Sequence, residues 1–98
     1  MKIDVRVNKL LDTERPIKAF VSITLDDKFA VHGVKVVQGK ERLLVSMPSR
    51  TFRTRDGTLI HRDVAHPIST EVRTEVDAAV MTAYMEALAA AEEETQSE

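Results

Sequence analysis

Apolar and polar side chains alternate through the first half of this sequence, and that alternation constrains the fold more than any other feature. A period of two sends successive side chains to opposite faces of a strand. The pattern occurs in residues 2–8, 17–25, 29–37 and 42–47, and short polar segments separate these ranges. It predicts four consecutive antiparallel strands.

The third predicted strand contains an irregularity. Its apolar side chains change face between Val31 and Val34, and Gly33 lies at the change. An isolated glycine at such a point is typical of a β-bulge or a sharp local twist. Pro48, which cannot donate a backbone hydrogen bond, is expected to end the fourth strand.

From Ser69 onward the apolar positions recur at spacings of three and four, as on one face of a helix. This apolar stripe consists of Val72, Val76, Ala79, Val80, Ala83, Ala87 and Leu88. The opposite face is predicted to carry Arg73, Glu75, Asp77, Thr82 and Glu86. Ser69 or Thr70 is the predicted N-cap, because serine and threonine accept hydrogen bonds from the first free helix amides.

These elements predict the α+β class, with an antiparallel four- to five-stranded sheet and a C-terminal helix lying across it. The fifth strand is a further short one that the long connection before the helix has room for. The chain of 98 residues allows one domain, which we assign to residues 1–91, and residues 92–98 are expected to form a disordered acidic tail. One helix leaves a sheet face and the sheet edges uncovered, so we predict a homodimer.

Composition excludes several classes of protein. The chain has no cysteine, which rules out disulfides and thiolate metal sites. The N-terminal segment alternates in polarity, and no apolar run approaches the ~18 residues that a membrane span requires. We therefore predict no membrane span and a cytoplasmic location.

The formal net charge of −2 conceals an uneven distribution along the chain. Residues 86–98 contain five acids and no base, so residues 1–85 hold 14 bases against 11 acids, a formal charge of +3. Within them, residues 47–67 carry four arginines and two aspartates, a local charge of +2. The acidic total is therefore compatible with a polyanionic partner for the basic part.

The segment "HRDVAH" brings His61, Asp63 and His66 close together in sequence, and His32 is a candidate to join them. Imidazole and carboxylate groups are ligands for zinc, but the same residues also serve to hydrogen-bond a connection in place. The structural interpretation is favoured, because His61 and Asp63 would face one side of a strand and His66 the other. We predict no metal site.

No enzyme signature is complete in this sequence. "HRD" occurs in the catalytic loop of protein kinases, but Ile68 stands where that loop has asparagine, and no glycine-rich phosphate loop is present. The serines lack the context of a catalytic nucleophile. We therefore predict no catalytic residue, no cofactor and no enzymatic activity.

The arginines of residues 50–62 admit a sharper hypothesis. Threonine hydroxyls lie among Arg50, Arg53 and Arg55, and Phe52 is available to stack on a base or to pack inward. Guanidinium groups match phosphate oxygens in a bidentate manner, so such a segment suits a nucleic-acid backbone. An exposed connection that is merely charged has the same composition, and composition does not separate the two.

A family resemblance separates them. "SITLDDKFAVHGVKVVQG", "MPSR" and "RDVAHPI", in this order, closely resemble the SpoVG family of bacteria, the stage V sporulation protein G or septation regulator, over residues 1–84. The resemblance implies a small homodimer with an antiparallel sheet and a C-terminal helix. It also implies a regulator that binds DNA and RNA and is linked to septation and, in spore formers, to sporulation. It implies no catalysis.

The resemblance also indicates site residues. The basic residue after "MPS" corresponds to Arg50, and the start of the helix after "AHPI" corresponds to Ser69 and Thr70. The connection "RTFRTRDGTLIH" is longer than the family pattern and adds arginines, and Gly33 replaces an expected acid. The predicted nucleic-acid contacts are Arg50, Arg53, Arg55, Arg62, Ser69 and Thr70.

A function of a different class stays open beside this one. It is a protein-interaction module of the division machinery, which would use the uncovered sheet face or the acidic tail. The predicted partners are therefore DNA and/or RNA, a second copy of the chain, and division or regulatory proteins.

Overall fold

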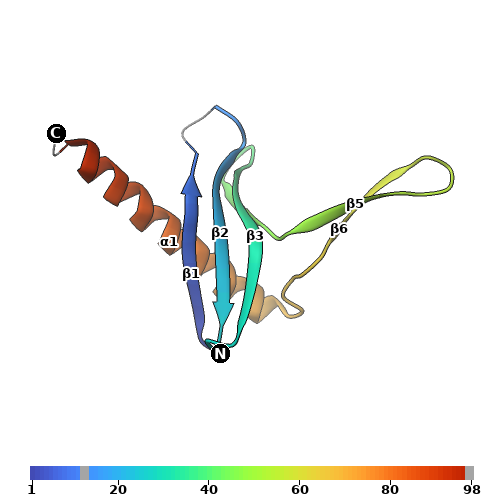
Figure 1. Ribbon diagram of the computed structural model, residues 1–98, viewed down its shortest axis with the longest axis horizontal. Coiled ribbons are helices and arrows are strands. Elements are labelled where there is room, and N and C mark those ends of the chain that lie inside the picture. Colours follow the sequence, from blue (N-terminus) through green and yellow to red (C-terminus); the bar gives the residue numbers. More distant parts are fainter. Residues whose placement is uncertain (12–13, 97–98) are drawn as a thin grey trace.

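The structure is a computed structural model that describes residues 1–11 and 14–96, the last four of them by backbone alone. Strands come first and a single helix closes the chain (Figure 1). The elements are β1 (Ile3–Leu10), β2 (Ile17–Leu25), β3 (Phe29–Gln38), β4 (Leu43–Ser46), β5 (Ser49–Arg53), β6 (Leu59–Asp63) and α1 (Thr70–Gln96).

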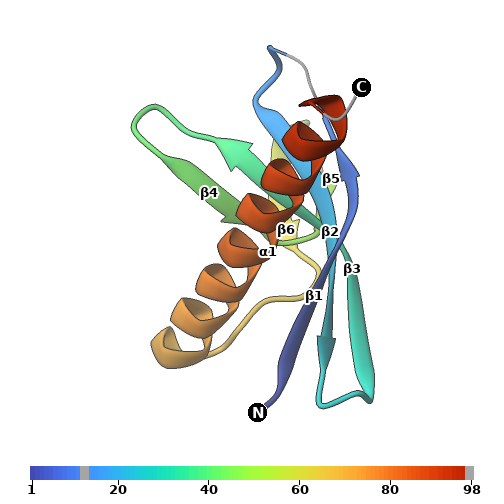
Figure 2. The same ribbon diagram turned by 90° about the vertical axis from the view of Figure 1, so that its left-hand side faces the viewer.

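Strands β1 to β4 form one antiparallel sheet in sequence order, as the alternation predicts. Helix α1 crosses one face of this sheet and leaves the other face to solvent (Figures 1 and 2). Each strand has an apolar side toward the helix, so burial of that side holds the two layers together. The α+β class is confirmed.

The core is mainly aliphatic, and valine dominates it. Its four largest fully buried side chains are Val21, Val34, Val36 and Val80. The helix also buries Val76 and Tyr84. The predicted stripe omits Tyr84, although the residue lies four positions after Val80 and therefore projects on the same side of the helix.

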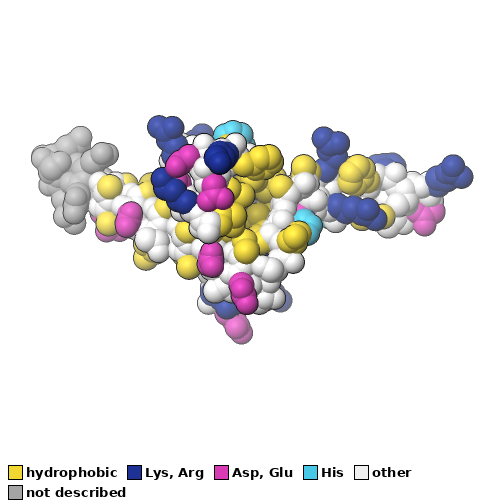
Figure 3. Space-filling view, turned by 90° about the horizontal axis from the view of Figure 1, so that it is seen from below, with side chains coloured by type: hydrophobic (Ala, Val, Ile, Leu, Met, Phe, Trp, Pro, Cys, Tyr) yellow, Lys and Arg dark blue, Asp and Glu magenta, His cyan; other side chains and the backbone are white. Residues whose placement is uncertain are grey.

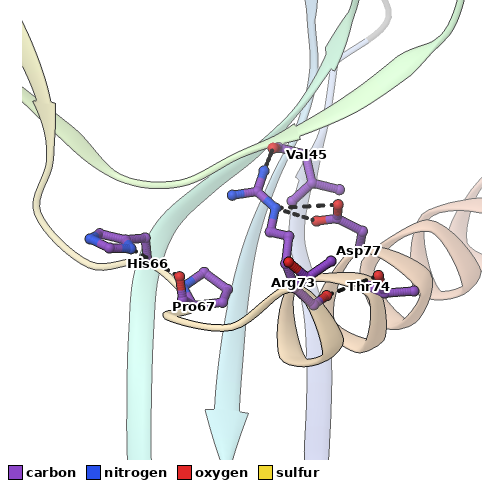
Figure 4. A network of polar contacts seen from close by, with 7 residues as sticks. Val45, His66, Pro67, Arg73, Thr74 and Asp77 are labelled. Carbon is purple, nitrogen blue, oxygen red and sulfur yellow. Dashed lines mark hydrogen bonds and ion pairs between the residues drawn. The ribbon is translucent and has the colours of Figure 1, made fainter.

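Arg73 corrects the predicted solvent face of the helix. Its Nη2 donates to the carbonyl oxygen of Val45 at 2.7 Å, and its Nε donates to Asp77 Oδ1 at 3.1 Å (Figure 4). The long side chain lies along the helix and places its charged end against β4. Arg73 thus links the first turns of α1 to the edge strand of the sheet.

The start of the helix follows the prediction and its end differs. The amide of Val72 donates to Ser69 Oγ at 3.2 Å, which confirms Ser69 as the N-cap. The helix continues past Ala91 to Gln96, because glutamate is a good helix former even where no apolar side chain remains to be buried. Residues 97–98 lie outside the described residues, and the domain boundary at residue 91 stays a prediction.

The predicted bulge in β3 is confirmed. Val21 pairs with Val34 and Ile23 pairs with Val31, so β3 contains one residue more than β2 between these two pairs. Gly33 has a φ of 83°, a conformation that side chains with a Cβ rarely adopt. The bulge therefore depends on glycine.

We expect Gly33→Ala to lower the free energy of unfolding by about 1–2 kcal/mol, the usual effect of a Cβ in the left-handed conformation. A Cβ at this position would also lie 3.4 Å from the Cβ of Pro48. Urea unfolding measures the change. Gly57→Ala is the comparison, because Gly57 has a similar φ of 87° with nothing within 4 Å of the added Cβ. Unchanged stability of Gly33→Ala would contradict the assignment of the bulge.

The connection between the sheet and the helix differs from the prediction of at most one added strand. Strands β5 and β6 pair only with each other and form a separate two-stranded hairpin, residues 49–63, which we call the arm. The arm projects from the sheet, as the end of α1 does on the other side (Figure 1). The radius of gyration of 15.3 Å accordingly exceeds the ~13 Å of a compact domain of this length.

Within the part of the chain that the structure describes, no helix has the length and hydropathy that a membrane crossing needs.

Candidate nucleic-acid interface

The register of the arm places Arg50 directly opposite Arg62. Side chains of a directly opposed pair share one face of a hairpin and lie close together. The pair Phe52 and Ile60 follows two positions along, so it lies on the same face as the two arginines. This face therefore combines two guanidinium groups with an aromatic and an aliphatic side chain.

The opposite face of the arm has a different composition. The Thr51 hydroxyl and His61 Nδ1 share a hydrogen bond of 2.9 Å, and Arg53 pairs with Leu59. Arg53 therefore points away from the side that carries Arg50 and Arg62, and Arg55 lies in the turn. The arginines surround the arm and do not form one patch.

All four arginines are exposed, and none has a carboxylate within ion-pair distance among residues 1–11 and 14–92, for which side chains are described. Figure 3 shows these basic groups along the projecting arm. Two like charges directly across a hairpin destabilise it. An anion between Arg50 and Arg62 would relieve this repulsion and accept hydrogen bonds from both guanidinium groups.

The turn of the arm is ordered by hydrogen bonds and is not the mobile connection that the sequence suggests. The Thr54 hydroxyl donates to the Asp56 carboxylate, and the Thr58 amide donates to Asp56 Oδ1 at 3.1 Å. Between the ends of the turn, the Thr54 amide donates to the Thr58 carbonyl at 2.9 Å. The positive φ of Gly57 closes the turn. Arg55 is thus held at the tip of the arm.

These hydrogen bonds predict a pH dependence of the turn. Donation from Thr54 and then from Thr58 lowers the pKa of Asp56 from 3.8 to about 2. A lowered carboxyl pKa stabilises the folded turn above pH 3.8, and this contribution is lost as the pH falls toward 2. We expect an NMR titration of the Asp56 carboxyl carbon to have its midpoint near 2.

Thr54→Val is the matched variant for this titration, because it removes the hydroxyl donor and keeps the shape of the side chain. It should raise the Asp56 midpoint toward 3.8. A wild-type midpoint already at the ordinary value would contradict the hydrogen-bonded turn.

The histidines bond to their surroundings in two ways. His61 bonds across the arm to Thr51, and His66 Nδ1 lies 3.0 Å from the carbonyl oxygen of Pro67 (Figure 4). A shallow polar depression at the base of the arm is lined by His61, Arg62, Asp63 and His66. Among the described residues, no group of three or more histidines or acids is arranged to hold a metal ion.

The helix start forms a second, separate part of the predicted site. Ser69 Oγ is already engaged as the cap of the Val72 amide, whereas Thr70 is exposed. Free amides of a first helix turn attract anions, but Glu71 lies in this turn and weakens the attraction. The structure thus places Arg50, Arg53, Arg55 and Arg62 on the arm and Ser69 and Thr70 at the helix.

The geometry of this site matches a known sequence family. The family model described as SpoVG matches residues 1–86, which include the sheet, the arm and more than half of α1. This chain belongs to the SpoVG family. The resemblance drawn from "MPSR" and "RDVAHPI" is therefore confirmed.

Relatives with the printed name "Putative septation protein SpoVG" align over most of their length. The protein of Heliobacterium modesticaldum is 52% identical over 88 residues, which cover 90% of this chain and 93% of that relative. The protein of Desulforudis audaxviator is 49% identical and covers 83% and 86%. The protein of Staphylococcus saprophyticus is 49% identical and covers 88% and 81%.

Proposed function

We propose that this member of the SpoVG family is a nucleic-acid-binding regulator linked to cell septation and, in spore formers, to sporulation. The link to septation comes from the names of its relatives. The observation that supports nucleic-acid binding is the arm, where Arg50 and Arg62 face each other without a counter-charge. The proposed location is the cytoplasm, and no catalytic step is part of the proposal.

Phosphate recognition by the arm follows from its shape. Each exposed guanidinium donates two parallel hydrogen bonds to a phosphate, and Arg55 at the tip extends the contact beyond the hairpin pair. The arm projects far enough from the sheet to approach a helical groove without a clash from α1 (Figure 1). Thr70 and the first amides of α1 supply additional donors.

A second copy of the chain is part of the proposed assembly. An apolar hollow of about 160 Å³ lies between the helix start and the sheet, and it is lined by Leu25, Phe29, Met47 and Pro67 among others (Figure 3). Nearby side chains stay exposed in the single chain, with Phe29 65% and Ile68 94% accessible. Two copies that cover this apolar surface would present two arms and double the phosphate contacts.

The homodimer predicts a specific mass. Sedimentation equilibrium should give twice the chain mass of 11.0 kDa at micromolar concentration. A mass of 11.0 kDa at all concentrations would contradict the dimer and leave one arm for each binding unit.

Electrophoretic mobility with random and genomic pools of DNA and RNA, measured across a salt series, tests the proposed function. Binding by phosphate contacts should weaken linearly in log–log form, with a slope of about −0.9 for each contact on duplex DNA. A dimer that uses Arg50, Arg53 and Arg55 from both arms would have a slope near −5. Absence of a shifted species even at low salt would contradict the proposal.

The apolar hollow favours one competing function, a protein-interaction module of the division machinery without nucleic-acid binding. Partners recovered with such a module would survive nuclease treatment. Their recovery would also be the same for wild type and for a variant without the arm arginines. The proposed function predicts the opposite result in both respects.

A further inference from the structure

The sheet face opposite α1 carries an ordered set of polar and aromatic side chains. No described helix or strand covers this face (Figures 1 and 2). Because Ala19, Val21, Val34 and Val36 point to the core, the residues between and beside them point outward. We call this surface the open face; its residues are Arg6, Asn8, Lys9, Phe20, Ser22, His32 and Lys35.

One cross-strand row of the open face places an aromatic ring between two lysines. Phe20 on the central strand β2 pairs with Lys9 on β1 and with Lys35 on β3. Directly opposed side chains on a sheet lie ~4.5–5.5 Å apart at Cβ, so both lysines flank the half-buried ring. Ser46 extends the same row on β4.

The neighbouring row is polar and held by hydrogen bonds. Arg6 pairs with Ser22, whose Oγ accepts a hydrogen bond of 2.6 Å from Asn8 Nδ2. The same Oγ lies 2.8 Å from His32 Nδ1. Two register shifts, one after Val7 and one beside Gly33, bring Asn8 and His32 to this position. The network fixes the surface beside Phe20.

The open face is positively charged. Arg6, Lys9 and Lys35 form no ion pair with any described residue. Asp4, the acid next to Arg6 on this face, has Oδ2 3.7 Å from Lys2 Nζ at the end of the sheet. The centre of the face therefore combines three unneutralised cations with one aromatic ring.

We propose that the open face binds single-stranded nucleic acid, with a base stacked on Phe20 and the adjoining phosphates bound by Lys9 and Lys35. In a duplex the base faces are already stacked and do not reach a ring in the middle of a flat sheet. In a single strand they are free. Four-stranded antiparallel sheets with helices on one face use aromatic side chains in this way in known RNA-binding domains. The proposal extends the proposed function to a second surface and does not depend on the arm.

Fluorescence anisotropy with three labelled probes tests the proposal: a mixed-sequence single-stranded RNA, the matching single-stranded DNA, and a DNA duplex. Phe20→Leu should weaken binding of both single strands about tenfold, because it removes the stacking surface and keeps an apolar side chain. The double variant Lys9→Ala with Lys35→Ala should reduce the single-strand salt slope by about 0.7 for each lysine. Duplex binding should change less than twofold.

Matched controls separate this effect from loss of folding or charge. Phe29→Leu changes an exposed phenylalanine that lies on the helix side of the same sheet, and it should leave single-strand binding unchanged. Lys28→Ala with Lys40→Ala removes two exposed lysines outside the open face. Thermal unfolding checks that Phe20→Leu is folded, and the lysine variant, which alters no core side chain, gives a second independent test.

The outcomes distinguish the open face from the arm. Single-strand binding that is lost only in Arg50→Ala, Arg53→Ala, Arg55→Ala would overturn the open-face proposal and support the arm. Single-strand binding that depends on Phe20, with no duplex binding, would support the open face and contradict the arm. Polyglutamate, a flexible anion without bases, should not compete effectively; competition equal to that of RNA would reduce the face to a cation patch and overturn the proposal.

Photochemical cross-linking gives a direct readout. RNA substituted with iodouracil cross-links to aromatic rings in stacking contact, so the modified peptide should contain Phe20. Cross-links confined to Phe52 on the arm would overturn the proposal.

Discussion

Alanine at Arg50, Arg53 and Arg55 together should weaken duplex DNA binding by ~100-fold or more for each chain at moderate salt. Each lost phosphate contact removes about 0.9 from the slope of log K against log salt, so three contacts correspond to nearly three powers of ten at ~0.1 M. The effect should shrink as salt rises, because counterions then compete for the same phosphates. Mobility-shift titrations at several salt concentrations measure both quantities.

A charge-matched variant provides the control. Alanine at Lys28, Lys40 and Arg42 removes three exposed cations from the connections beside the main sheet. It changes net charge by the same amount as the arm variant, so it should reduce affinity only through weak long-range attraction, by less than about fivefold. Equal losses in the two variants would show that total charge, and not the arm, determines binding.

Tyr84→Ala should have the largest effect on stability. Tyr84 is only 6% exposed and packs in the core beside Val76 and Val80. Removing a buried aromatic ring usually lowers stability by about 3–5 kcal/mol, through lost burial and the cavity that remains. That is a large fraction of the ~5–15 kcal/mol that a domain of this size possesses. Urea unfolding followed by circular dichroism measures the change.

Met85 provides a neighbouring control. Its side chain is 55% exposed, so Met85→Ala should change stability by less than about 0.5 kcal/mol. If Tyr84→Ala were as mild as Met85→Ala, helix α1 would not pack against the sheet in the register described. The helix start at Ser69 and Thr70 would then lack the support that positions it.

The sheet could be predicted from the sequence because its signals are local. Alternation of apolar and polar residues marked all four strands, and Gly33 marked the bulge between Val31 and Val34. Serine before an apolar helical stripe marked the N-cap. In each case the residues that carry the signal also make the contact.

The arm and the helix contacts depend on tertiary structure and were harder to predict. Arg73 has the charge of a solvent-facing residue, yet its partner is the carbonyl of Val45, which is distant in sequence. Tyr84 combines a polar hydroxyl with a large ring, so a pattern of aliphatic residues passed over it. Hairpin pairing in the arm is a cooperative choice between two weak strand segments around Asp56 and Gly57.

The candidate site shows the same division. The sequence identified which arginines are available, but not that Arg50 faces Arg62 while Arg53 points to the other side. Treating "RDGT" as a hairpin turn and numbering outward from it would have given this register. The Lys9, Phe20 and Lys35 row was invisible in sequence, because its members come from three strands.

An NMR titration of the arginine Nε–H signals with a short DNA duplex tests the central claim most directly, since each guanidinium that binds phosphate reports on itself. The account predicts that signals of Arg50, Arg53, Arg55 and Arg62 shift in proportion to added DNA, while that of Arg42 stays in place. Shifts confined to backbone signals around the apolar hollow, with unchanged arm arginines, would contradict it.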